Sequence, residues 1–202
     1  MVRQKVKRAF FSDFYLRMSA GRRVAYLGVF IALAVVANIA SIEVTASLKI
    51  TFTYVVAFFS GTFLGPLLGF AVCFFGDAVA FLLPTGGGVY WPLTGVCSGL
   101  LALIPGFVMN CVHFRFRGGV YVKTLISVVL MYLLVSCSLG AYSNYLYVKY
   151  VIYAGKEYTT LFGTYLAGKL LFTSVVSLVN YVLVFLLIPV INSIKPLKIR
   201  IE

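Results

Sequence analysis

The chain has 202 residues, of which 62% are hydrophobic and only 11% are charged. A soluble domain carries roughly 25% charged residues, so this chain has too few to cover a surface that faces water. Apolar runs of about 20 residues recur along it, and each has the length of a helix that crosses a bilayer. The composition therefore predicts an all-α, polytopic membrane protein with six transmembrane helices. Continuous apolar runs argue against a transmembrane β-barrel, whose strands alternate apolar and polar positions.

The net charge of +12 raises the question of nucleic-acid binding, but the distribution of the basic residues argues against it. Most of them lie in three clusters that are separated by pairs of apolar runs. Cytoplasmic loops retain Lys and Arg in this way, so both termini are predicted to be cytoplasmic. Nucleic-acid binding requires a basic face on a folded domain, and none is expected here. The clusters consist of Arg3, Lys5, Lys7, Arg8, Arg17, Arg22 and Arg23, then Arg115, Arg117 and Lys123, then Lys195, Lys198 and Arg200.

The chain is predicted to consist of a basic arm, a membrane domain and a basic tail. Residues 1–23 form a cytoplasmic N-terminal arm, interpreted as an amphipathic segment on the anionic inner leaflet. Residues 24–191 form the six-helix membrane domain, and residues 192–202 form the cytoplasmic tail. A basic stretch before an apolar run also resembles a signal peptide. Because five further spans follow, we interpret the first helix as retained.

The six spans are delimited by the apolar runs and by the residues that interrupt them. Pro66 disfavours helix at Gly65 and so divides the long apolar stretch 50–83 into two short spans. Pro105 is expected to kink the fourth span. The polar stretch 41–49 and the segment 148–165 are placed outside. The spans are predicted at residues 24–40, 50–63, 66–83, 93–112, 124–147 and 166–191.

Ionisable residues within an apolar chain are costly and mark candidate functional positions. Asp77 falls in the middle of the third span, Lys169 near the outer start of the sixth, and Lys49 at the end of the first outer loop. In one interpretation these residues converge on a polar ligand at the outer mouth. In the other, the lysines extend to the lipid headgroups and Asp77 forms a hydrogen bond between helices. Asn144 and Asn180 are uncharged, and the same two interpretations, ligand binding or a hydrogen bond between helices, apply to them.

The uncharged segment Pro84-Thr-Gly-Gly-Gly-Val-Tyr-Trp-Pro92 is the most informative loop. Its glycines, including Gly86 and Gly87, permit backbone conformations closed to other residues. Tyr90 and Trp91 supply flat faces with polar tips, which suit stacking on an aromatic ring. The alternative is an aromatic belt at the membrane interface, which composition alone favours.

The remaining motifs indicate packing and not catalysis. Small residues at fourfold spacing, among them Gly61, Gly65 and Gly69, allow helices to approach closely. The sequence has no HExxH, CxxC, GxSxG or Walker A motif, so no enzymatic activity, cofactor or metal site is predicted. The cysteines all fall within predicted spans without metal-type spacing and are interpreted as buried thiols that pack as small hydrophobes. They are Cys73, Cys97, Cys111 and Cys137.

Several short motifs within residues 24–112 occur in a recognisable order. They are Leu48-Lys-Ile-Thr-Phe52, Phe63-Leu-Gly-Pro66-Leu-Leu-Gly69, Gly76-Asp77, Phe81-Leu-Leu-Pro84-Thr-Gly86-Gly87 and Tyr90-Trp91-Pro92. This order resembles the S components of energy-coupling factor (ECF) vitamin transporters, most closely the folate-type branch. Beyond residue 112 the resemblance rests on six short spans and cytoplasmic termini.

The resemblance implies a division of labour in a bacterial plasma membrane. An S component is a multi-pass protein that binds a vitamin from outside, without catalysis of its own. A separate transmembrane subunit and two ATPase subunits supply the energy. The loaded S component is expected to topple in the membrane and present its pocket to the cytoplasm.

The resemblance also assigns roles to residues. A folate offers a flat pterin for stacking and glutamate carboxylates for a lysine. The implied partner-docking stripe on the first helix is Gly28, Ala32, Ala37 and Ser41. The resemblance implies that the Pro84–Pro92 loop and the start of the sixth span line the ligand, which favours Tyr90, Trp91 and Lys169. Together with the polar candidates above, the predicted substrate-binding residues are Tyr90, Trp91, Lys169, Asp77, Gly86, Gly87, Lys49 and Asn144.

Two departures from the family pattern keep alternatives open. Val36 stands where the docking motif has another alanine, and Thr94-Gly-Val-Cys-Ser98 stands where the folate branch often has an arginine. Another vitamin, such as pantothenate, pyridoxine or a thiamine precursor, therefore remains a candidate. A membrane interaction protein with no small-molecule site is the alternative of a different class.

Overall fold

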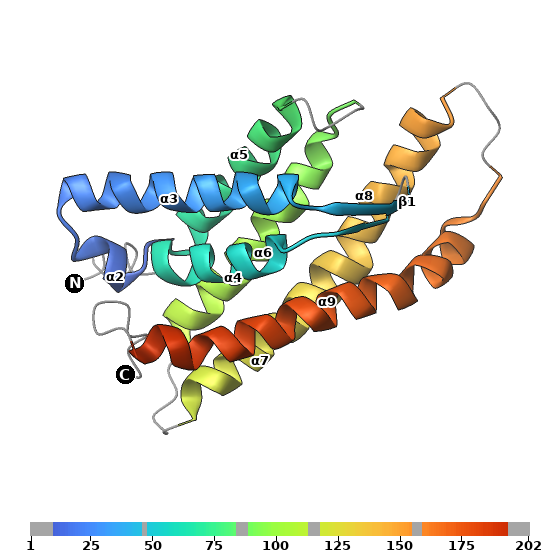
Figure 1. Cartoon of the computed structure of the whole chain (residues 1–202). Helices are drawn as coiled ribbons and strands as arrows, with labels where there is room; N and C mark the ends of the chain where they lie inside the picture. Colours follow the sequence, from blue (N-terminus) through green and yellow to red (C-terminus); the bar gives the residue numbers. More distant parts are fainter. Residues whose placement is uncertain (1–9, 46–47, 84–88, 113–117, 155–158, 194–202) are drawn as a thin grey trace.

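The computed structural model describes residues 10–45, 48–83, 89–112, 118–154 and 159–193. These residues form a helical bundle with one small antiparallel hairpin (Figure 1). Two short apolar helices pack within it, α4 (Thr53–Leu64) and α5 (Pro66–Leu82). Within the described part of the chain, four helical stretches have the length and hydropathy to cross a membrane. They are α3 (Ala20–Ile39), α6 (Pro92–Cys111), the continuous stretch Gly119–Ile152, and α9 (Phe162–Ser193).

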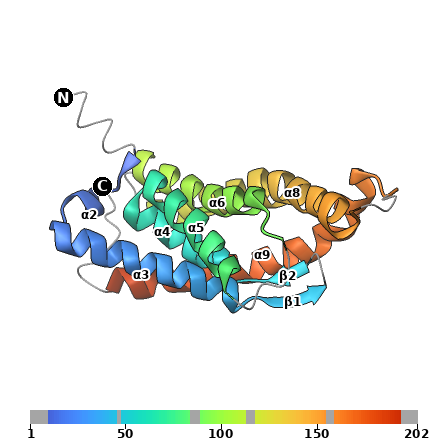
Figure 2. The same ribbon diagram turned by 90° about the horizontal axis from the view of Figure 1, so that it is seen from above.

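The bundle has two distinguishable ends. The short helix α2 (Asp13–Leu16) and the end of α9 lie at one of them, the α2 end (Figure 1). The hairpin of β1 (Ile42–Thr45) and β2 (Leu48–Ile50) extends from α3 toward α8 and α9 at the other, the hairpin end (Figure 2). Both described ends of the chain therefore lie on the same side of the bundle.

Three features of the backbone differ from the predicted spans. The polar stretch 41–49, predicted only as an outer loop, contains the β1–β2 hairpin, in which Glu43 pairs with Lys49. The helix that contains the fifth predicted span continues to Ile152, whereas the segment from residue 148 was predicted to lie outside the membrane. This long helix comprises α7 (Gly119–Leu130), the π-helical η1 (Met131–Leu139), α8 (Gly140–Tyr147) and the π-helical η2 (Val148–Ile152). An apolar run predicts a helix but does not distinguish the rare i→i+5 bonds of a π-helix from the i→i+4 bonds of an α-helix.

The start of the chain is anchored to the bundle at the α2 end. The backbone N–H of Ser12 donates to the Leu64 carbonyl over 3.3 Å, and the side-chain hydroxyl of Ser12 donates to the Phe63 carbonyl. The Arg23 guanidinium donates to the carbonyls of Tyr15 and Leu16 over 3.1 and 2.7 Å. Residues 10–23 of the predicted arm are therefore packed or helical, and residues 1–9 lie outside the described residues.

Glycines bring α4, α5 and α6 into backbone contact. A Cβ on Gly61 would overlap the Ala102 carbonyl oxygen, and one on Gly69 would lie 2.7 Å from the Gly61 Cα. A Cβ on Gly106 would lie 2.6 Å from the Pro66 Cα. This is the close helix approach that the small-residue spacing predicts.

The expectation for the cysteines holds at two positions and fails at a third. Cys73 and Cys97 are buried in the core, whereas Cys137 is half-buried. Cys111 is exposed, because it is the last residue of α6 and lies beyond the packed part of that helix.

The contact at Gly61 yields a stability prediction. Gly61→Ala is expected to lower the free energy of unfolding by about 1–3 kcal/mol, because the added methyl group overpacks a backbone contact. Thermal unfolding of the detergent-purified protein measures the change. Gly21→Ala in α3 is the matched control, since nothing lies within 4 Å of its Cβ. Equal melting temperatures for the two variants would contradict the prediction.

Candidate functional site

Among the buried polar groups that make no hydrogen bond to another described residue, four come from three neighbouring elements. We call them the Lys169 cluster. Tyr90 and Trp91 precede α6, Ser143 lies on α8, and Lys169 lies on α9. The unpaired atoms are the Tyr90 hydroxyl, the Trp91 indole nitrogen, the Ser143 hydroxyl and the Lys169 ammonium. A buried polar atom without a partner costs about 1–3 kcal/mol, and more if charged, so such a cluster points to a ligand.

The Lys169 side chain is the most costly member, because it carries a charge. Its ammonium lies 5.7 Å from the centre of the Tyr165 ring, and it interacts electrostatically with the Cys97 thiol on α6. Cys97 also lies near Ser143 and Asp77. A neutral ring and a thiol do not replace the hydration of an ammonium group, so an anionic partner is the chemical complement of this site.

Gly95 lies in the first turn of α6, and its lack of a side chain lets the Tyr90 hydroxyl and the Asp77 carboxylate approach the helix at this residue. A Cβ there would lie 2.6 Å from the Tyr90 hydroxyl and 3.4 Å from a carboxylate oxygen of Asp77. Burial raises the pKa of Tyr90, and the nearby Asp77 charge raises it further. The Tyr90 hydroxyl therefore stays protonated over a wider pH range than usual and remains a hydrogen-bond donor.

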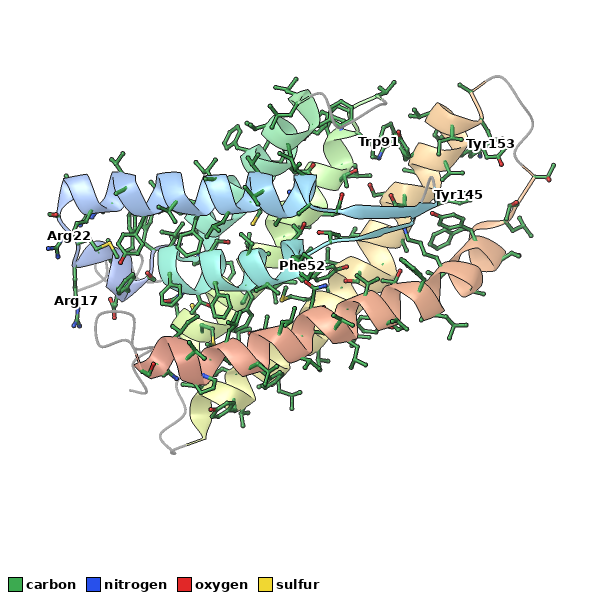
Figure 3. The ribbon with its side chains drawn as sticks, in the orientation of Figure 1. Arg17, Arg22, Phe52, Trp91, Tyr145 and Tyr153 are labelled. Carbon is green, nitrogen blue, oxygen red and sulfur yellow. The ribbon has the colours of Figure 1, made fainter. Side chains whose placement is uncertain are left out.

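Aromatic rings surround the cluster. Trp91 lies between the start of α6 and α8 (Figure 3), with its ring 6.3 Å from that of Tyr147. Tyr90 contacts Phe81 at 5.3 Å, and Tyr145 contacts Tyr165 at 5.6 Å. The site combines flat apolar faces with a few polar tips, which suits an aromatic ligand that also carries polar groups.

The other predicted substrate-binding residues are placed unevenly. Gly86 and Gly87 lie outside the described residues. Lys49 lies in β2 at the hairpin end, and only its backbone is described. Asp77 is half-buried beside Tyr90, and Asn144 is half-buried next to Ser143 on α8. Of the predicted set, the structure thus places Tyr90 beside Asp77, and it places Asp77 and Lys169 within electrostatic range of the same thiol, that of Cys97.

A second group of polar residues was not predicted as a site. We call Tyr54, Ser136, Ser177, Asn180 and Tyr181 the Asn180 cluster; it joins α4, η1 and α9. Only Asn180 was considered from the sequence, as a single neutral polar residue. A spacing signal was present, since Tyr165, Lys169, Thr173, Ser177 and Tyr181 recur every four residues on α9. Serine and tyrosine are common in membrane helices, so this pattern is weak without a structure.

The predicted docking stripe does not form one surface. Gly28 and Ala32 are exposed on α3, and nothing lies within 4 Å of a Cβ on Gly28. Ala37 is buried and Ser41 is half-buried. The physical reason is helical spacing: Ala37 follows Ala32 by five residues and so falls on the packed face with Ala34, which contacts Gly76.

Comparisons with known proteins define the family. No curated protein matches the chain. A crystal structure of FolT bound with folic acid matches with a TM-score of 0.62 and 21% identity, over 81% of this chain and 90% of that one. This similarity shows a shared fold. Residues 19–189 match the family described as ECF-type riboflavin transporter, S component. The chain therefore belongs to this family of ECF transporter S components, as its sequence motifs predicted.

Proposed function

We propose that this protein captures a folate-like vitamin from outside the cell for ATP-driven uptake by partner ECF subunits. The observation that carries the proposal is the buried Lys169 ammonium, which has no hydrogen bond to another described residue. A ligand carboxylate would supply the missing anion in a charge-assisted hydrogen bond. The glutamate part of a folate carries two such groups. Family membership supports vitamin capture as the general role.

The aromatic residues around Lys169 support a ligand with a flat ring. Trp91 and Tyr90 present faces for stacking, and the Trp91 indole nitrogen and Tyr90 hydroxyl remain available as hydrogen-bond donors. Folate has two aromatic parts, a pterin and a benzoyl ring, in the same molecule as its carboxylates. The fold shared with folate-bound FolT agrees with this assignment.

Riboflavin is the second candidate, because the family description names it. Its flat ring would suit the aromatic walls. However, riboflavin is uncharged and would leave the Lys169 ammonium without an anion, so the site favours folate. Pantothenate has a carboxylate but no ring, whereas pyridoxine and thiamine precursors have a ring but no carboxylate. Each of these matches only half of the site.

We further propose that the α2 end faces the cytoplasm and the hairpin end faces outward. Arg17 and Arg22 are exposed at the α2 end (Figure 3), as the positive-inside rule requires of a cytoplasmic face. With α4 and α5 counted as short spans, the bundle crosses a bacterial plasma membrane six times. The exposed surface of α3 at Gly28 and Ala32 would contact the ECF transmembrane subunit, and the two ATPases would bind that subunit.

Replacement of Lys169 tests the carboxylate contact. Lys169→Ala is expected to weaken folate binding about 10- to 100-fold, because a hydrogen bond to a charged group contributes about 1.5–3 kcal/mol. Quenching of Trp91, the single tryptophan, during folate titration in detergent measures the affinity. Lys149→Ala removes another lysine near the hairpin end and is the matched control.

The outcomes of this titration separate the candidates. Saturable folate binding that is lost only in Lys169→Ala supports the folate assignment. Unchanged affinity in that variant removes Lys169 from the site. Saturation by riboflavin but not by folate, in protein freed of copurified ligand, would keep the importer role and change the vitamin.

The α3 surface generates a separate prediction about partner binding. Gly28→Leu is expected to reduce copurification with the ECF transmembrane subunit, because the leucine side chain prevents close helix approach. Vitamin affinity should stay unchanged. Gly163→Leu on α9 is the control, since its Cβ position is equally open. Full recovery of the complex with Gly28→Leu would exclude this surface.

A further inference from the structure

The Asn180 cluster is a second set of unsatisfied polar atoms, deeper in the bundle than Lys169. Three of its side chains are almost inaccessible: Ser177 and Asn180 are each 1% exposed, and Tyr181 is 8% exposed. The Ser177 hydroxyl, the Asn180 carbonyl oxygen and the Tyr181 hydroxyl make no hydrogen bond to any described residue. Such a concentration of unpaired atoms in one apolar core requires a physical explanation.

The orientation of the Asn180 amide is determined by its neighbours. Its NH₂ group donates to the carbonyls of Thr51 and Val176, both over 2.9 Å. Because both partners are acceptors, the nitrogen must face them and the amide oxygen must face away. The side-chain oxygen of Asn180 is therefore an unused hydrogen-bond acceptor that faces the interior of the bundle. The two hydrogen bonds from the amide nitrogen fix its orientation.

The hydroxyl groups beside Asn180 can both donate and accept. Ser177 lies near Tyr54 and Tyr181, but these approaches do not meet hydrogen-bond geometry. The Tyr54 hydroxyl accepts a hydrogen bond from Ser136 over 3.1 Å. The Tyr54 and Tyr181 rings meet edge to face, with centroids 5.8 Å apart. The cluster thus offers one fixed acceptor, the Asn180 oxygen, and two adaptable hydroxyls, those of Ser177 and Tyr181, in a group that includes two aromatic rings.

The two clusters share helix α9, which carries Lys169 as well as Ser177, Asn180 and Tyr181. Cys97 on α6 lies within electrostatic range of both Lys169 and Tyr54. Along α9, Asn180 follows Lys169 by eleven residues, a rise of about 16 Å. One elongated ligand with a charged group at one end and a polar ring at the other would reach both clusters.

We propose that the Asn180 cluster binds the hydrogen-bonding edge of the vitamin's ring system while Lys169 binds its carboxylate. This inference rests on the proposed function. A pterin has a pyrimidine-type edge with N–H donors for the Asn180 oxygen and acceptors for the Ser177 and Tyr181 hydroxyls. In this arrangement the benzoyl ring of a folate lies beside Trp91. The Tyr54 and Tyr181 rings separate on binding and contact the pterin instead of each other.

Two variants test this orientation without breaking a hydrogen bond of the described structure. Tyr181→Phe and Ser177→Ala each remove only an unpaired hydroxyl. Either variant is expected to weaken binding of folate and of free pterin about tenfold, with p-aminobenzoyl-glutamate unaffected. Lys169→Ala is expected to show the opposite selectivity, weakening p-aminobenzoyl-glutamate and not pterin. Calorimetric titration of the detergent-purified protein with all three compounds measures these affinities.

Control measurements separate recognition from stability. Removing an unpaired buried hydroxyl should leave the melting temperature without ligand unchanged or raised. Ser127→Ala is the matched control, because Ser127 is also buried but donates to the Lys123 carbonyl within its own helix. Its affinity for all three compounds should equal that of the wild type.

The possible results keep this inference distinct from the proposed function. If folate affinity falls in Lys169→Ala but not in Tyr181→Phe or Ser177→Ala, the function stands and the ring-edge inference is wrong; ordered water then satisfies the cluster. If riboflavin binds in place of folate, the wild-type protein should prefer riboflavin to N3-methylriboflavin, and both Tyr181→Phe and Ser177→Ala should abolish that preference. An unchanged preference in these variants overturns the inference. If no vitamin binds, the function and the inference both fail.

Discussion

The close contact of α4, α5 and α6 is the constraint on which the rest of the structure depends. Gly61 on α4 lies against the Ala102 carbonyl on α6 and close to Gly69 on α5, with no room for side chains between the backbones. In a membrane, helix association relies on such packing because lipid supplies little hydrophobic driving force. The contact positions Asp77 at the hairpin end of α5 next to Gly95 at the start of α6.

The long helix from α7 to η2 and the helix α9 complete the site from the other side. A smaller fraction of their residues is buried than in α4, and much of their surface faces outward. Their buried faces carry polar groups, among them Ser143, Lys169 and Asn180. Apolar packing therefore holds one half of the bundle together, while the other half contributes most of the unsatisfied polar atoms found among the described residues. This asymmetry suits a protein whose polar interior is completed by a ligand, because the ligand can replace contacts that the bundle lacks.

Much of the fold follows from the sequence because membrane helices obey simple rules. The length of an apolar run, the break at Pro66 and the position of charged residues place most helices within a few residues of their observed bounds. The hairpin at 42–50 and the π-helix η1 could not be predicted in this way. The pairing of Glu43 with Lys49 and the i→i+5 bonds of η1 are details of backbone hydrogen bonding, and neither the length of an apolar run nor the position of charges specifies them.

The site shows the same division between local and tertiary information. By itself, the sequence determined the membrane class and the S-component family, because these depend on composition and short motifs, and it predicted Trp91 and Lys169 as candidate ligand contacts. Only the tertiary structure decided that Ala37 is buried and that Ser177, Asn180 and Tyr181 form a cluster with Tyr54. The reason is that the burial of a polar atom, and whether it has a partner, depends on which helices pack together. That arrangement is a property of the whole bundle and not of any one segment.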